Sequence, residues 1–156
     1  MTAVIQRVCG ARVSADGAFC GEIGKGLYIL LGVMRGDSEK DADLLAAKIG
    51  KLRVFSDDNG KMNLALPDVG GAVMVVSNFT LAAHYAHGNR PDYLAAEEPE
   101  RANALYEYFV GKMRESVASV KTGVFGADMR AELITDGPVT IVMHSEILKT
   151  GRKTEK

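Results

Sequence analysis

The chain has 156 residues, which is enough for one domain with a substantial hydrophobic core and too few for two ordinary domains. Hydrophobic residues make up 47% and charged residues 25%, a composition that excludes a disordered or fibrous chain. Nineteen Lys and Arg against twenty Asp and Glu give a formal net charge of −1, so the chain is not a polycation that coats nucleic acid.

The sequence shows neither a membrane-spanning segment nor a leader. No apolar run approaches the ~18–20 residues needed to cross a bilayer, and residues 1–7 lack the basic-then-apolar pattern of a leader. We therefore expect a cytoplasmic protein with no membrane contact. Cys9 and Cys20 are too few for a disulfide scaffold, and their positions in expected strands predict two small buried side chains.

The first third of the sequence predicts three strands and a helix. Residues 3–8 alternate weakly, and Val13–Cys20 contains Asp16-Gly17, a pair that suits the tight turn of a hairpin. Leu27–Val33 is a continuous apolar run, which predicts a central strand covered on both faces. Asp37 or Ser38 then caps a helix whose apolar face consists of Ala42, Leu45, Ala46, Ile49 and Leu52.

The middle of the chain predicts two further strands, a long loop and a second helix. Arg53–Phe55 is a short strand, and the buried strand Ala72–Val76 leads directly into residues 77–81. Residues 83–99 show no periodicity, and a loop of this length is usually functional or mobile. An amphipathic helix follows from Glu100, with an apolar face of Ala102, Leu105, Tyr106, Phe109, Met113 and Val117.

The last part predicts three strands and a tail. The strands are Val120–Phe125, Met129–Ile134 and Val139–His144, and a turn over residues 135–138 is expected to join the last two because it contains Gly-Pro. Residues 146–156 are polar and basic without a core-facing pattern, which predicts a frayed tail. The sequence thus predicts one compact, β-rich domain of mixed α+β class over residues 1–145, with two main amphipathic helices, and a tail over 146–156.

Several common kinds of site are not indicated. His84 and His87 have ligand spacing, but they lie in the loop and lack the glutamate of H-E-x-x-H, so no metal site is expected. The glycines of residues 21–26 stand in the reverse order of the dinucleotide fingerprint and lie between two strands, so no nucleotide cofactor is expected. No serine is surrounded by G-x-S-x-G, although a triad assembled by the fold stays open.

Two segments remain as candidates for chemistry. Ser77-Asn78-Phe79-Thr80-Leu81 places hydroxyl groups at the end of a buried strand, where backbone N–H groups can turn towards a ligand. Thr135-Asp136-Gly137-Pro138-Val139-Thr140 contains the Gly-Pro pair, and composition alone favours a simple hairpin turn there.

These two segments resemble the signatures S-Q-x-T-L and N-x-G-P-x-T of the D-aminoacyl-tRNA deacylases. Asn78 stands in place of Gln in the first signature and Thr135 in place of Asn in the second. Shorter matches occur in the same order along residues 1–145, at residues 3–8, 21–26, 60–63, 88–91 and 125–129. The resemblance therefore implies the fold of this family over nearly the whole chain.

The resemblance also implies an activity. The family hydrolyses the ester that joins a D-amino acid to the terminal ribose of tRNA, and it clears glycine mischarged on tRNA-Ala. The expected partners are the 3′ end of aminoacyl-tRNA and a second copy of the chain in a homodimer, with no DNA. No cofactor and no metal ion are expected.

A main-chain filter would select the D-amino acid. Gly137-Pro138 would correspond to the family's cis Gly-Pro pair, which projects from one subunit into the pocket of the other. Glycine allows two adjacent carbonyl groups to point the same way and hold the α-ammonium group of the substrate. A D side chain then points outward, an L side chain collides with the backbone wall, and Arg7 would brace the pair. The other residues expected to bind substrate are Asn78, Phe125, Met129, Thr135 and Thr140.

Two roles are open for Thr80 in the chemical step. It could attack the ester carbonyl carbon, but no nearby base is evident in the sequence. Alternatively, Thr80 and Ser77, with the backbone N–H groups around Phe79 and Thr80, position the ester and stabilise the oxyanion. Water, or the ribose 2′-hydroxyl, would complete the reaction. We favour this second role, which predicts dependence on the 2′-hydroxyl.

Two alternative functions remain because both signatures are altered. The protein could bind tRNA without hydrolysis, or it could be a deacylase with relaxed chirality. If Asn78 and Thr135 only hydrogen-bond the loops around the pocket, the double substitution Asn78→Gln and Thr135→Asn is expected to raise activity modestly and leave the D/L preference unchanged.

Overall fold

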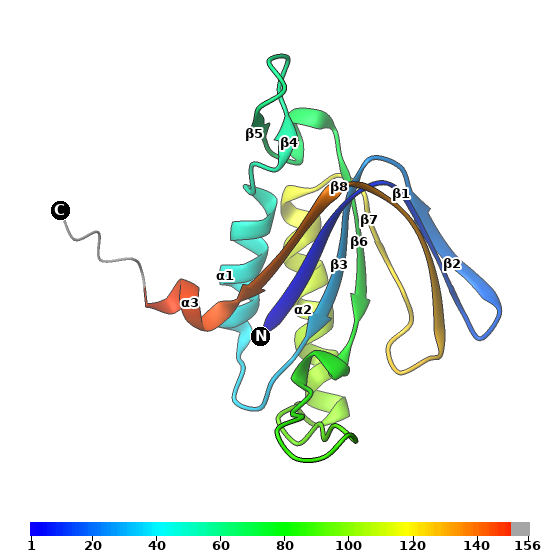
Figure 1. Cartoon of the computed structure of the whole chain (residues 1–156), viewed down its shortest axis with the longest axis vertical. Helices are drawn as coiled ribbons and strands as arrows, with labels where there is room; N and C mark the ends of the chain where they lie inside the picture. Colours follow the sequence, from blue (N-terminus) through cyan, green and yellow to red (C-terminus); the bar gives the residue numbers. More distant parts are fainter. Residues whose placement is uncertain (151–156) are drawn as a thin grey trace.

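The computed structural model describes residues 1–150, in which two long helices pack against one face of a curved β-sheet (Figure 1). In chain order the elements are β1 (Thr2–Ala15), β2 (Ala18–Ile23), β3 (Gly26–Gly32), α1 (Glu39–Gly50), β4 (Phe55–Ser56), β5 (Met62–Leu64), the 3₁₀ helix η1 (Pro67–Val69), β6 (Ala72–Ser77), the 3₁₀ helix η2 (Phe79–Ala82), α2 (Pro99–Ser116), β7 (Val120–Thr122), β8 (Met129–His144) and α3 (Ser145–Lys149). The predicted mixed α+β class with two main helices is confirmed.

The main sheet combines antiparallel and parallel pairs. Neighbouring strands follow the order β2-β1-β3-β6-β7, and β8 also pairs with β1. β1 is antiparallel to its three partners, whereas β3 is parallel to β6 and β6 to β7. Each parallel pair is joined through a long helix, as parallel neighbours require. The sheet curves until β2 approaches β7, since a Cβ added at Gly21 would lie 3.4 Å from the Cβ of Lys121. The result is barrel-like.

β3 contributes to two hydrophobic clusters because successive residues of a strand point to opposite faces. Leu27, Ile29 and Leu31 are fully buried in the cluster that lies against α1 and α2. Tyr28 belongs to a smaller cluster on the other face, together with Val8, Ala11, Val13, Ile23, Met74 and Val76. This confirms the prediction of a strand covered on both faces, and part of the second face also lines a cavity.

The prediction of a turn over residues 135–138 is wrong. β8 runs continuously from Met129 to His144 and pairs with β1 on both sides of this segment, with shifts of register around Val8. Residues 136–139 therefore form an irregularity in one strand rather than a reversal. The composition of this segment is that of a turn, but the long partner strand β1 offers hydrogen bonds before and after it.

Smaller differences concern element lengths and one cysteine. β7 ends at Thr122 rather than Phe125, and the strand expected at residues 53–55 covers Phe55–Ser56, where it pairs with the unpredicted β5. Cys9 is exposed rather than buried, because it lies at the irregular part of β1, and Cys20 is half-buried. No helix within residues 1–150 is long and apolar enough to span a membrane.

The chain after β8 is partly helical. Residues 145–149 form α3, so the expectation of a frayed segment is wrong there, whereas residues 151–156 lie outside the described part of the chain. The division into a domain over 1–145 and a tail over 146–156 stays a prediction.

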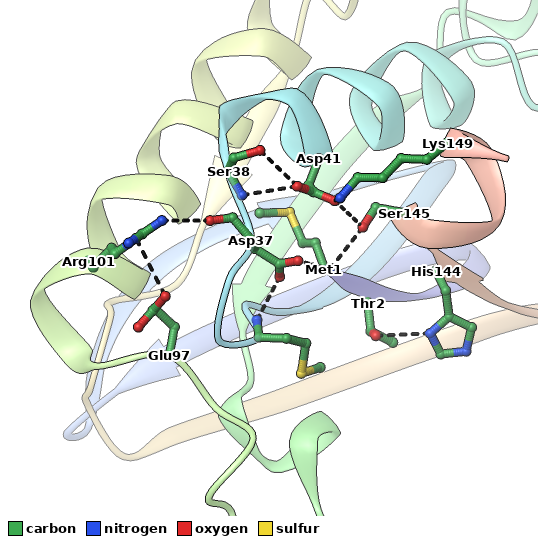
Figure 2. A network of polar contacts seen from close by, with 11 residues as sticks. Met1, Thr2, Asp37, Ser38, Asp41, Glu97, Arg101, His144, Ser145 and Lys149 are labelled. Carbon is green, nitrogen blue, oxygen red and sulfur yellow. Dashed lines mark hydrogen bonds and ion pairs between the residues drawn. The ribbon is translucent and has the colours of Figure 1, made fainter.

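A buried polar cluster, which we call the Asp41 network, attaches α3 to α1 (Figure 2). The carboxylate of Asp41 is fully buried and accepts hydrogen bonds from the hydroxyls of Ser145 at 2.7 Å and Ser38 at 2.9 Å. The ammonium group of Lys149 lies 2.6 Å from the same carboxylate. The amino group of Met1 joins the network by donating to the hydroxyl of Ser145 at 2.9 Å.

The network fixes the charge of Asp41. Burial by itself raises the pKa of a carboxyl group, because it disfavours the charged form. The hydrogen bonds from Lys149, Ser145 and Ser38 outweigh this effect and hold the pKa of Asp41 well below its usual range. The same contact raises the pKa of Lys149. The pair is therefore ionised at neutral pH, which explains how a polar sequence keeps α3 folded against the domain.

Candidate active site

A cavity of about 680 Å³ lies at the end of β6. Its walls come from the second face of the sheet, from residues 77–80, from the start of α2 with the loop before it, and from the connection between β7 and β8. The sheet contributes Tyr28 and Val76 to this lining, and α2 contributes Pro99 and Ala102. Cavities of this volume hold small-molecule ligands.

The segment after β6 turns sharply into the cavity wall. Asn78 is the N-cap of η2, and its backbone N–H donates to the carbonyl oxygen of Leu31 at 2.8 Å. Its side-chain oxygen accepts from the backbone N–H of Thr80 at 3.1 Å and also from the hydroxyl of Thr80. This N–H was expected to face the substrate, but Asn78 already binds it.

Six of the residues predicted for the site lie together in the lining, namely Ser77, Asn78, Phe79, Thr80, Phe125 and Met129. The ring of Phe79 is mainly exposed and contacts the edge of Tyr93, with the centroids 5.1 Å apart. The ring of Phe125 lies 6.1 Å from that of buried Tyr106. The segment from β6 and the connection before β8 therefore face the same cavity.

The other five predicted residues, Arg7, Thr135, Gly137, Pro138 and Thr140, do not line this cavity. Arg7 is nearly buried and donates to the carbonyl oxygens of Val54 at 2.5 Å and Asp136 at 3.1 Å. Its guanidinium also lies 3.0 Å from the carboxylate of Asp136. Gly137 and Pro138 are exposed, and the peptide bond between them is cis. Arg7 therefore ties the residue before this pair to the rest of the fold.

The strand register separates this second group from the cavity. Thr135 pairs with Val8, and the ladder continues across β3 to Ala72, where β6 begins. Ser77 lies at the opposite end of β6. At ~3.3 Å per residue along β6 and ~4.8 Å per strand across the sheet, the path over the sheet from Thr135 to Ser77 is roughly 20 Å. Gly137 and Pro138, which follow Thr135 in β8, are not among the residues that line the cavity of their own chain.

Sequence reasoning missed three polar residues of the lining, Tyr28, Glu97 and Asp128. Strand alternation could have placed Tyr28 on the face of β3 that Leu27 does not face. Burial on that face raises the pKa of the Tyr28 hydroxyl. The carboxylate of Glu97 accepts from the backbone N–H of Glu98 at 2.9 Å, which lowers its pKa. Glu97 lies in the loop without periodicity, so the sequence held no signal for it.

No metal centre is evident in the part of the chain that the structure describes. Among residues 1–150, no three His, Cys, Asp or Glu side chains come close enough to hold a metal ion. The ring nitrogen Nδ1 of His84 lies 3.2 Å from the carboxylate of Asp92 in the loop before α2, and neither His84 nor His87 lines the cavity.

Comparison with known proteins gives matches over nearly the whole chain. A family model described as D-Tyr-tRNA(Tyr) deacylase matches residues 4–144. A D-aminoacyl-tRNA deacylase of Anaeromyxobacter dehalogenans is 55% identical over 148 residues, which are 95% of this chain and 99% of the relative.

Two solved structures share the fold. One, described as a c-Myc DNA Unwinding Element Binding Protein, is 37% identical with a TM-score of 0.87, and the match covers 92% of this chain and 98% of that one. The other, described as a probable eukaryotic D-amino acid tRNA deacylase, has a TM-score of 0.79 at 13% identity, over 92% and 99% of the two chains. From the family match and the relative at 55% identity, we conclude that the chain belongs to the D-Tyr-tRNA(Tyr) deacylase family.

Proposed function

We propose that this protein is a cytoplasmic D-aminoacyl-tRNA deacylase, which hydrolyses the ester between a D-amino acid and the terminal ribose of tRNA. The observation that carries the proposal is the position of Ser77–Thr80, the altered family signature, in the wall of the cavity at the end of β6. The products are the free D-amino acid and tRNA. Glycine mischarged on tRNA-Ala is a second substrate, because it has no side chain for the site to reject.

In the chemical step, Thr80 positions a donor group of the substrate or the attacking water rather than attacking the ester itself. The hydroxyl of Thr80 donates to the amide oxygen of Asn78, and an amide cannot accept its proton at neutral pH. Water adds to the ester carbonyl carbon, and the bond to the ribose oxygen then breaks as that oxygen takes up a proton. The ribose 2′-hydroxyl is close enough to relay this proton. The negative charge on the carbonyl oxygen requires a hydrogen-bond donor in the wall.

The backbone N–H of Phe79 is suited to be that donor. The N–H of Thr80 is bound by Asn78, whereas within residues 1–150 no acceptor is found for the N–H of Phe79. The first N–H groups of a helix have no partner inside the helix, which leaves this one free for a ligand. An aligned donor of this kind contributes about 10²–10³-fold to the rate of acyl transfer in other enzymes.

The chiral filter is formed by Gly137-Pro138 of a second copy of the chain. Gly137 and Pro138 do not line the cavity of their own chain, which supports a role for the pair in the cavity of a second copy. Both residues are exposed, and Arg7 holds the adjacent Asp136. Ile134 and Val142 are also exposed on β8, which gives this strand an apolar surface suited to contact with another subunit.

The function is tested by measuring release from one tRNA charged with a D-amino acid, its L-enantiomer or glycine, with and without the protein. We expect release of the D-amino acid and of glycine, and none of the L-amino acid above the rate without protein. Binding of the charged tRNA without release would support a nucleic-acid-binding relative instead, and release of the L-amino acid would support relaxed chirality.

The cross-subunit filter predicts a homodimer. Sedimentation at low micromolar concentration should give twice the chain mass of 16.7 kDa. The same sample should be assayed for release, because a fully active monomer would contradict any scheme in which one subunit completes the site of another.

Substitution of Thr80 distinguishes positioning from nucleophilic attack. If the hydroxyl only positions the ester, Thr80→Ala should reduce the release of D-amino acid by about tenfold, the value of one hydrogen bond of ~1.4 kcal/mol. Loss of a nucleophile reduces rates by several orders of magnitude. Single-turnover rates at saturating protein separate the two, and a loss above ~10⁴-fold with intact tRNA binding would make Thr80 the nucleophile.

A further inference from the structure

The contact between Asn78 and Thr80 has defined hydrogen-bond polarity. One atom of the Asn78 amide receives the backbone N–H of Thr80, so that atom must be the oxygen. The same oxygen lies within hydrogen-bond distance of the Thr80 hydroxyl. Because an amide oxygen carries no hydrogen, the hydroxyl must donate to it. The assignment therefore follows from chemistry rather than from a choice of amide orientation.

The backbone of Asn78 is itself held in place. Its N–H donates to Leu31 at the end of β3, at 2.8 Å, and its carbonyl oxygen accepts from the N–H of Leu81 at 3.3 Å. The side-chain oxygen therefore projects from an anchored position. A side chain that is fixed at its backbone loses little additional freedom when it holds a neighbouring residue.

This geometry determines what Thr80 can offer to a ligand. Its hydroxyl proton points at Asn78, so the lone pairs of its oxygen are left to face the cavity that Thr80 lines. Thr80 can then accept a hydrogen bond but cannot donate one. Its partner in the substrate must be a donor, such as an ammonium group, a ribose hydroxyl or the attacking water.

We propose that Asn78 is a positioning residue that sets the Thr80 hydroxyl as an acceptor and leaves the Phe79 N–H as the free amide donor of this segment. The inference rests on the proposed deacylase function and adds a specific task for the altered signature position. By this division, Thr80 receives a donor of the substrate while Phe79 faces the developing negative charge.

Asparagine is better suited to this task than the glutamine of the family signature. Asn is among the preferred N-cap residues because its short side chain reaches the N–H two residues later, and Gln is not among them. The extra methylene of Gln enlarges the ring closed by this bond and adds a rotatable bond that must be fixed. In this chain, Asn78→Gln should therefore lower activity, which reverses the expectation from the sequence alone.

The test combines turnover with a direct measure of the contact. We expect Asn78→Ala to lower kcat for D-aminoacyl-tRNA by about tenfold with KM changed less than twofold, and Asn78→Gln to lower it by about threefold or more. Asn59→Ala, an exposed asparagine in the β4–β5 turn, is the matched control and should behave as the wild type. In parallel, amide hydrogen exchange at Thr80 should be slow in the wild type and fast in Asn78→Ala.

A double-mutant cycle separates positioning from general destabilisation. If Asn78 acts through the Thr80 hydroxyl, Asn78→Ala should cost less than threefold in the Thr80→Ala background. Three results would each overturn the inference. They are a tenfold cost of Asn78→Ala that is unchanged in the Thr80→Ala background, an Asn78→Gln variant as active as the wild type, and fast amide exchange at Thr80 in the wild type. Absence of D-amino acid release by the wild type would instead overturn the proposed function, while exchange at Thr80 would still decide whether Asn78 makes the contact.

Discussion

Replacing Asp41 with alanine is expected to lower the free energy of unfolding by about 2–3 kcal/mol, because the buried carboxylate accepts hydrogen bonds from two hydroxyls, whereas the exposed Lys149 can be hydrated after its partner is removed. The variant leaves the ammonium group of Lys149 without its carboxylate and the hydroxyls of Ser145 and Ser38 without their acceptor. Denaturant unfolding followed by circular dichroism measures the loss. Asp58→Ala, which removes an exposed carboxylate in the β4–β5 turn, is the matched control and should change stability by less than about 0.5 kcal/mol.

The Asp41 network also predicts how stability depends on pH. The pKa of Asp41 is lowered in the folded protein, so the unfolded chain binds this proton more tightly. The contribution of Asp41 is therefore complete above the unfolded pKa of ~3.9 and is lost as the pH falls towards the lower folded value. Below about pH 4, the wild type should lose stability more steeply than Asp41→Ala. If the two pH profiles had the same slope below about pH 4, folding would not lower the pKa of Asp41 and the prediction would be wrong.

Gly137→Ala is expected to reduce the release of D-amino acids by about 100-fold while changing the free energy of unfolding by no more than about 2 kcal/mol. Gly137 has φ +149°, and an added Cβ would lie 2.2 Å from the backbone nitrogen of Val139, so the segment must move. Residues 137 and 138 are exposed, and Val139 packs against the main hydrophobic cluster only as a partly buried side chain, so the stability cost should stay small. A displacement of ~1 Å at a positioning element can cost about 10²-fold in rate.

Gly17→Ala is the matched control for this substitution. Gly17 also has a positive φ, +82°, but an added Cβ there would have no neighbour within 4 Å. This variant carries the backbone cost of a side chain at positive φ without displacing a neighbour. Equal activities of the two variants, measured at a temperature where both are folded, would exclude Gly137 from the chiral filter.

Local patterns in the sequence predict those helices and strands whose formation depends on their own residues alone. The continuous apolar run Leu27–Val33 and the apolar spacing from Ala42 to Ile49 predict β3 and α1, and both are found. The continuity of β8 is different, because it depends on a partner strand from the other end of the chain. α3 is too short to show an apolar pattern, and it is held by polar contacts to Asp41 and by Leu148, which packs against the core.

The same distinction applies to the site. The position of Ser77 and Thr80 at the end of a buried strand was predictable from the sequence, because strand ends turn at the edge of a sheet. The contact between Asn78 and Thr80 was not, since it depends on the turn geometry of η2. The separation of Gly137 from the cavity required the register of three strand pairs, which no local pattern contains.

The pairing of β1 with β8 constrains how the chain folds during synthesis. Thr2 pairs with His144 and Ala15 with Met129. One edge of β1 therefore stays unpaired until residues 129–144 have been synthesised. Contacts between such distant residues slow folding, and an unpaired strand edge can hydrogen-bond to other chains. The nascent protein therefore cannot complete its sheet until translation has passed His144, and until then the free edge of β1 can pair with other chains.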